Sequence, residues 1–164
     1  MIWTDRLVTR PTGLLLTAIL ISGCGSSVEI PEYAAELTPV TGIVSANGQP
    51  VAGANVIFHP EGGNAQTAYG RTDTEGRYTL STPIAGVSLE QQAGVVPGTY
   101  KITVNRIARP DGSPIPEGVT EADAMAEGAR ETVPPLFNDP GRSPLTIQVE
   151  ASRSEYDLSI RLMK

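Results

Sequence analysis

Alternation of apolar and polar residues recurs through the chain after residue 40 and predicts β-strands rather than helices. The clearest example is the run Thr99–Asn105. Its Tyr100, Ile102 and Val104 are expected to face the core. Thr103 lies between them in the sequence and is expected to face outward. Seven strands are predicted, at residues 40–45, 51–60, 66–72, 77–81, 99–105, 145–149 and 156–162.

Turn signals separate these strands at short intervals. Asn47–Gly48 is the dipeptide most typical of a two-residue hairpin. The strand that ends near Pro60 stops there because proline has no N–H to donate to a ladder. Asp73–Gly76 predicts a tight turn, in which Asp73 accepts hydrogen bonds from nearby backbone amides and Gly76 adopts the left-handed conformation. Short strands with regular turns predict an all-β sandwich.

One long segment, residues 106–143, interrupts this pattern. Its ends are rich in proline, and Thr120 with Asp123 has the spacing of a capping box, which predicts a short helix over 120–130. Connections of 38 residues are typical of functional loops or of partly disordered segments. We expect one stripe of the helix to cover the sandwich, with binding of a partner as the alternative; the stripe contains Ala122, Met125, Ala126 and Ala129.

The first 23 residues have the layout of a secretory signal peptide. Arg6 and Arg10 precede an apolar stretch from Leu14 to Ile21, which small residues follow. The eight residues of that stretch would span about 12 Å as a helix, far less than a hydrocarbon layer of roughly 30 Å. A permanent membrane-spanning helix is therefore not expected here.

The sequence Ile21-Ser22-Gly23-Cys24 resembles the bacterial lipobox. The resemblance implies a diacylglyceryl group on Cys24, cleavage before it and acylation of the new amino terminus. Each buried methylene adds about 0.8 kcal/mol, so several acyl chains form a stable membrane anchor where one chain would not. Gly25 rather than aspartate follows the cysteine, which by resemblance to lipoprotein sorting rules favours the outer membrane, on its periplasmic or its surface face.

Residues 24–39 are polar and lack periodicity, which predicts a flexible tether between the anchor and the domain. The alternative is that Val28, Ile30 and Tyr33 pack back onto the domain as an edge segment. The domain itself is expected to span residues 40–164, including the insert 106–143.

The net charge limits the expected partners, and the cysteine count limits the expected disulfides. The formal net charge is −6, and removal of the leader with its two arginines and one aspartate makes it about −7. An acidic chain without a basic run repels phosphate backbones, so nucleic acid is not an expected partner. One cysteine excludes an intramolecular disulfide.

Three stretches together resemble the carboxypeptidase regulatory-like domain, a transthyretin-like (prealbumin-type) sandwich. They are residues 40–56, 72–80 and 96–104, and residues 137–149 are similar to the closing part of small bacterial lipoproteins that carry this domain. The resemblance implies a seven-stranded sandwich. It implies no activity, because these motifs encode turns and strand faces. The compact regulatory domain does not need the insert 106–143.

Candidate catalytic and metal-binding residues are few. His59 is the sole histidine, so the zinc or iron ligand sets used by enzymes of related folds cannot be assembled from this chain. Asp73 and Glu75 are weak candidates for a calcium site, because calcium needs six to eight oxygen ligands and a capped turn is the favoured explanation of Asp73. We predict no cofactor and no enzymatic activity.

These observations predict a membrane-anchored lipoprotein whose domain is a non-enzymatic binding or structural module of the cell envelope. Its expected partners are the lipid bilayer, through Cys24, and an envelope protein or glycan. One alternative is a glycan- or peptidoglycan-binding module, with Tyr33, Tyr69 and Phe137 as the aromatic residues that could contact sugar. The other alternative is an enzyme that uses the insert 106–143 as a lid.

Overall fold

The computed structural model describes residues 30–163, so the predicted signal peptide, Cys24 and the first part of the tether lie outside the described residues. The strands are β1 (Thr41–Ala46), β2 (Gln49–Pro50), β3 (Asn55–Pro60), β4 (Ala68–Arg71), β5 (Arg77–Thr79), β6 (Gly98–Asn105), β7 (Ile107–Ala108), β8 (Arg130–Glu131), β9 (Thr146–Val149) and β10 (Leu158–Ile160). The helices are η1 (Glu32–Glu36), η2 (Leu89–Gln92), α1 (Glu121–Ala126) and α2 (Pro135–Asn138). Each predicted strand segment overlaps one of these strands, and β1 and β6 each extend one residue beyond the predicted bounds. The two-residue strands β2, β7 and β8 are additional.

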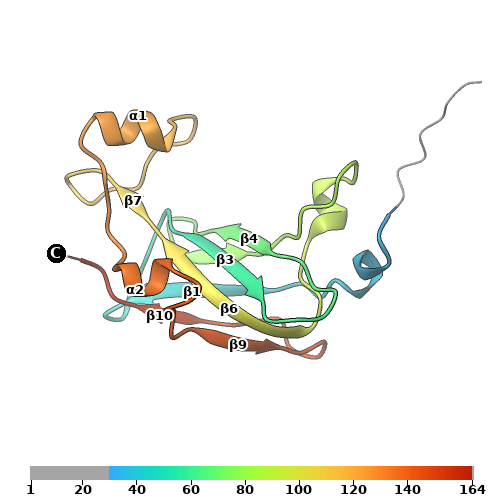
Figure 1. Ribbon diagram of the computed structural model, residues 1–164. Helices are drawn as coiled ribbons and strands as arrows, with labels where there is room; N and C mark the ends of the chain where they lie inside the picture. Colours follow the sequence, from blue (N-terminus) through green and yellow to red (C-terminus); the bar gives the residue numbers. More distant parts are fainter. Residues whose placement is uncertain (1–29, 164) are drawn as a thin grey trace, which may run out of the picture.

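The strands form two four-stranded sheets and one two-stranded sheet, β7-β8 (Figure 1). The first sheet has the order β10-β1-β2, with β5 also paired to β1, and the second has the order β4-β3-β6-β9. All pairings are antiparallel except that of β1 with β10, which is parallel. The described residues therefore form an all-β fold with few and short helices.

The two sheets enclose one apolar core. Phe58 of β3 lies between two other aromatic rings, with its centroid 6.3 Å from that of Tyr78 and 5.7 Å from that of Tyr100. Tyr100, Ile102 and Val104 are fully buried, as the alternation predicts. Thr103 is the exception to the outward prediction, since it is only 3% exposed. Its hydroxyl lies 2.9 Å from His59 Nε2, so neighbouring side chains cover it on the outer face.

The two ends of the domain differ. Figure 1 shows η1 at one end and the insert, with β7 and α1, at the opposite end. Thr38 forms an antiparallel bridge with Val95, so backbone pairing with the domain begins two residues before Val40. Ile30 is exposed and Tyr33 is half-buried, and η1 contributes no buried residue. None of the helices within residues 30–163 has the length and apolar character that a membrane crossing requires.

The part of the insert around α1 forms a small cluster of its own instead of covering the main core, whereas Val133 and Phe137 further along the insert belong to the main core. Thr120 caps α1 by accepting a hydrogen bond from the Asp123 amide, as predicted. The predicted apolar stripe is wrong, because Ala122, Met125 and Ala126 are exposed, with Met125 at 55%. The helix ends at Ala126 and packs on the insert itself; the buried members of this cluster are Ala124, Ala129 and Ile115.

Candidate functional site

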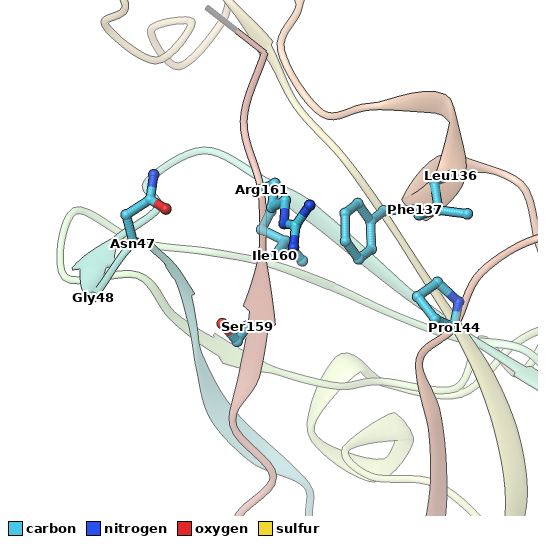
Figure 2. A pocket seen from close by; sticks show the side chains of 8 residues that line it. All are labelled: Asn47, Gly48, Leu136, Phe137, Pro144, Ser159, Ile160 and Arg161. Carbon is cyan, nitrogen blue, oxygen red and sulfur yellow. The ribbon is translucent and has the colours of Figure 1, made fainter.

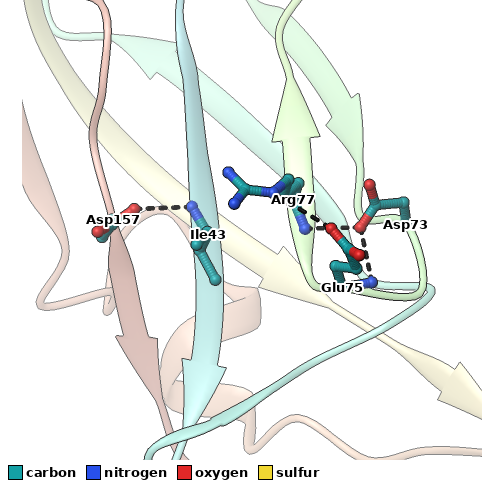
Figure 3. Close-up of polar contacts among 5 residues, drawn as sticks. All are labelled: Ile43, Asp73, Glu75, Arg77 and Asp157. Carbon is teal, nitrogen blue, oxygen red and sulfur yellow. Dashed lines mark hydrogen bonds and ion pairs between the residues drawn. The ribbon is translucent and has the colours of Figure 1, made fainter.

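The two calcium candidates lie in the turn between β4 and β5 and have different roles there (Figure 3). Asp73 Oδ1 accepts hydrogen bonds from the amides of Glu75, at 2.8 Å, and Arg77, at 2.9 Å. Gly76 has φ of 74°, the left-handed conformation that the turn requires. Glu75 forms an exposed ion pair with Arg77 at 3.4 Å. Asp73 therefore caps this turn, as the sequence predicts, and within residues 30–163 no three His, Cys, Asp or Glu side chains converge as metal ligands would.

Replacing Asp73 with alanine is expected to lower the free energy of unfolding by about 1 kcal/mol, because two turn amides lose their acceptor. Urea unfolding followed by circular dichroism would measure the change. Glu75→Gln is the matched control, since an exposed ion pair contributes roughly 0–1 kcal/mol. Equal unfolding midpoints for the two variants would show that Asp73 does not stabilise the turn.

The outward-facing side of the β4-β3-β6-β9 sheet carries several polar side chains. Strand register determines which of them are neighbours. Ile57 lies opposite both Tyr69 and Thr103. Asn55 lies opposite both Arg71 and Asn105. The chain thus places aromatic, amide and guanidinium groups in two adjacent rows across three strands.

A shallow groove of about 430 Å³ runs between these rows. We call it the sheet groove; its lining residues are Asn55, Val56, Ile57, Tyr69, Gly70, Arg71 and Asn105. Tyr69 is 47% exposed at its edge. The side-chain amide of Asn55 donates to Asn105 Oδ1 at 2.9 Å and to Glu121 Oε1 at 3.2 Å, which brings the insert helix to the groove. Aromatic, amide and charged groups together can hold a polyhydroxylated ligand.

His59 lies on the same face, next to Lys101 across the strand pair. Its Nε2 is 2.9 Å from the Thr103 hydroxyl, and partial burial lowers the pKa of the imidazole from its ordinary value. The ring is therefore a neutral hydrogen-bonding partner of Thr103 at neutral pH. This contact gives His59 a structural role on the sheet.

Two further cavities flank the domain. Figure 2 shows the first, of about 500 Å³, between α2 and β10, with Phe137, Ile160 and Arg161 in its wall. The second, of about 620 Å³, lies between the turn at Asp73 and residues 114–119 of the insert. If the insert acted as a lid, it would cover this second cavity. The carboxylates in the cavity wall are those of Asp73, which caps the turn, and of the exposed Glu117.

The three aromatic residues considered for sugar contact have separate locations. Phe137 is 7% exposed and belongs to the main core cluster, so it cannot serve as an open platform, contrary to the sequence-based prediction. Tyr33 lies on η1, away from the sheet groove. Tyr69, at 47% exposed, is the one of the three whose open ring lies beside a groove with polar groups. Asn55, Arg71 and Asn105 were missed because each reads in the sequence as an ordinary outward-facing strand residue.

Comparison with known proteins adds little. No known protein family matches the chain, and no curated protein is significantly similar to it in sequence. A 9R-lipoxygenase from Cyanothece is similar in structure over 95% of this chain and 17% of that chain, at 15% identity and a TM-score of 0.32. The chain thus spans 17% of the lipoxygenase, and so weak a similarity carries no argument about fold or activity.

Proposed function

We propose that the protein is a lipoprotein anchored through acylated Cys24, whose all-β domain is a non-enzymatic binding or structural module of the cell envelope. The observation that carries the proposal is the lipobox-like sequence Ile21–Cys24, because cysteine at its end supplies the thiolate needed for lipid attachment. Backbone pairing with the domain begins at Thr38, so the segment between Cys24 and the domain is short. Gly25 after the cysteine favours the outer membrane as its location.

The place where the chain enters the domain fits this proposal. The chain enters the domain at the end occupied by η1, and the insert lies at the opposite end (Figure 1). A lipid anchor before η1 would therefore be attached at the end of the domain opposite the insert. Two buried hydroxyl groups that could act in catalysis have structural partners instead. Ser143 Oγ donates to the carbonyl of Ile102, and the Tyr78 hydroxyl donates to the carbonyl of Tyr156.

The finer fold assignment, a seven-stranded transthyretin-like sandwich, is part of the same proposal. Seven of the strands have three or more residues, and they are β1, β3, β4, β5, β6, β9 and β10. Their division between two sheets around one core supports a sandwich. An experimentally determined structure in which the strand order differed from that of transthyretin-like domains would remove this part of the proposal.

Replacing Cys24 with serine tests the anchor. The wild-type protein is expected in the outer-membrane fraction, with a mass that shows cleavage before Cys24 and added acyl chains. The variant should lack the acyl mass and leave that fraction, since serine has no thiolate for lipid transfer. Ser26→Ala, two residues further along, is the control and should behave as wild type. An unmodified, uncleaved wild-type amino terminus, or wild-type protein in the cytosol, would contradict the proposal.

A glycan- or peptidoglycan-binding module is the second candidate, and one observation favours it. Tyr69 is exposed at the edge of a groove that also contains the paired amides of Asn55 and Asn105. Tyrosine combines an apolar ring with a polar hydroxyl, which suits contact with a sugar ring. The alternative that the protein is an enzyme would be supported if the purified protein turned over any substrate in a panel of hydrolase substrates.

A further inference from the structure

We propose that the sheet groove binds a saccharide that carries carboxylate groups, with Tyr69 as the stacking platform and Arg71 as the carboxylate-binding residue. The proposal rests on the function proposed above, that the domain is a binding module, and it adds the location of the site and the chemical class of the ligand. The sheet groove has a volume of about 430 Å³, which lies within the roughly 300–1,000 Å³ usual for small-ligand sites.

Tyr69 is held rigidly enough to serve as a platform. Strand β4 pairs with β3 on one side, where Tyr69 lies opposite Ile57. On the other side, the amide and carbonyl of Tyr69 each form a hydrogen bond of 2.9 Å with Ser81. Because both edges of the strand are paired, the exposed ring projects from a fixed backbone and little conformational entropy is lost on binding.

The two asparagines leave complementary groups for a ligand. Their mutual hydrogen bond of 2.9 Å uses Nδ2 of Asn55 and Oδ1 of Asn105. Within residues 30–163, Asn55 Oδ1 and Asn105 Nδ2 have no hydrogen-bond partner in the protein. One is an acceptor and the other a donor, and a sugar hydroxyl both donates and accepts. The pair can therefore bind neighbouring hydroxyls without rearrangement.

Arg71 sets the charge preference. Its guanidinium makes one long contact in the described part of the chain, 3.5 Å to the carbonyl of Ile115, and it lines the sheet groove. The arginine ion pair formed within residues 30–163 is that of Arg77 with Glu75. In a chain of net charge −6, an exposed guanidinium that forms no ion pair within residues 30–163 favours an anionic ligand. Its planar donors match a carboxylate in two parallel hydrogen bonds.

Glu121 and Lys101 complete the polar surroundings. Glu121 lies 3.2 Å from the Asn55 amide, where its carboxylate can accept from sugar hydroxyls. Lys101 lies on the same face of β6, with its ammonium 2.9 Å from the Thr146 hydroxyl, and can attract a second carboxylate along an extended chain. An alternation of acceptors and cations suits an acidic saccharide better than a phosphorylated peptide, whose charge is concentrated in one group.

Binding of defined oligosaccharides to the full-length lipidated protein, purified in a detergent without a sugar headgroup, tests the inference. The acidic probes are hexagalacturonate, a glucuronate-containing hexamer and a glycan strand containing N-acetylmuramic acid; the neutral probe is cellohexaose at the same ionic strength. Calorimetry is expected to show at least one acidic probe binding tenfold or more tightly than cellohexaose. Arg71→Gln should weaken this binding about tenfold and reduce the preference for acid. Tyr69→Ala should weaken both classes of ligand.

Arg77→Gln and Tyr33→Ala are matched controls outside the groove and should bind as wild type. The inference is overturned if no acidic probe binds more tightly than cellohexaose, or if Arg71→Gln and Tyr69→Ala leave binding unchanged. Mass spectrometry of the same preparation reports whether Cys24 is acylated. An acylated protein that does not bind acidic saccharide would refute this site without contradicting the proposed anchor. A protein that lacks the lipid but binds acidic saccharide would contradict the anchor and support the site.

Discussion

Gly42→Ala is expected to destabilise the domain by about 3 kcal/mol, the upper end of the usual range for forcing an extra carbon into a packed interior. A Cβ at this position would lie 2.0 Å from the carbonyl oxygen of Tyr156 and 2.9 Å from a ring carbon of Tyr78. Both distances are far shorter than a van der Waals contact. The second residue of β1 must therefore lack a side chain.

The neighbours of Gly42 cannot easily move away. The amide of Tyr156 donates to the carbonyl of Thr41 at 2.9 Å, and its carbonyl accepts from the buried Tyr78 hydroxyl. Burial is the main reason that the pKa of Tyr78 is raised well above its ordinary value, with smaller contributions from Asp157 and Tyr156. Relief of the clash would thus break at least one buried hydrogen bond, which costs about 1–3 kcal/mol when a partner remains unsatisfied.

Gly98→Ala is the matched control, because Gly98 is also a strand glycine. A Cβ there would meet only a ring carbon of Tyr100, at 3.9 Å, an ordinary contact. That variant should be neutral or slightly more stable, since alanine restricts the unfolded chain. Urea unfolding of both variants measures the difference. Similar midpoints for Gly42→Ala and wild type would show that β1 can separate from Tyr156 without loss.

Arg106→Met is expected to lower the free energy of unfolding by about 3 kcal/mol and the melting temperature by about 10 °C. Arg106 follows β6 directly and is only 7% exposed. Its Nε donates to the carbonyl of Ala52 at 2.7 Å, and Nη2 donates to that of Gly112 at 2.7 Å. One side chain thus joins the β2–β3 connection to the start of the insert. Methionine fills similar space and leaves both carbonyls without this donor.

The charge on Arg106 has a partner nearby. Burial lowers the pKa of the guanidinium, and the neighbouring Glu131 carboxylate acts in the opposite direction. Glu131 Oε1 also accepts hydrogen bonds from the amides of Arg106, Thr132 and Val133. The two residues therefore join the start of the insert to residues 131–133 and to the β2–β3 connection. Loss of Arg106 would leave the partly buried Glu131 carboxylate without this neighbouring positive charge.

Thermal unfolding followed by circular dichroism tests this expectation. Arg77→Met is the control, because Arg77 has an exposed side chain with a single long ion pair and should change the melting temperature by no more than about 2 °C. Limited proteolysis adds a second measurement: Arg106→Met should expose the insert to cleavage at lower protease concentration. An Arg106→Met protein as stable and as resistant as Arg77→Met would show that the insert is held by other contacts.

Local features of the fold were predictable from sequence because their causes lie within a few residues. Asn47 and Gly48 both adopt positive φ, 52° and 76°, as the hairpin between β1 and β2 requires. The Asp73 turn and the Thr120 helix cap involve hydrogen bonds across two to four residues. Such contacts depend on residue type and spacing, which a sequence displays directly.

The candidate site was predictable only in part. Tyr69 was identified as an aromatic residue that could contact sugar, and it is exposed in the structure. The partners of Tyr69 were not predictable, because Asn55 and Asn105 come from strands whose pairing the alternation does not specify. The opposite error occurred at Phe137, which is buried because α2 packs against β6 and into the main core.

The sequence alone determined the all-β character, the turns, the inward faces of the strands and the expectation of a lipid anchor, since these depend on local preferences and short motifs. Only the tertiary structure decided which strands are neighbours, including the parallel pair that places Val44 opposite Leu158. It also decided that Gly42 must lack a side chain and that Asn55, Tyr69 and Arg71 form one groove. The physical reason is that pairing and packing depend on shape complementarity between residues far apart in the chain, which periodicity does not encode.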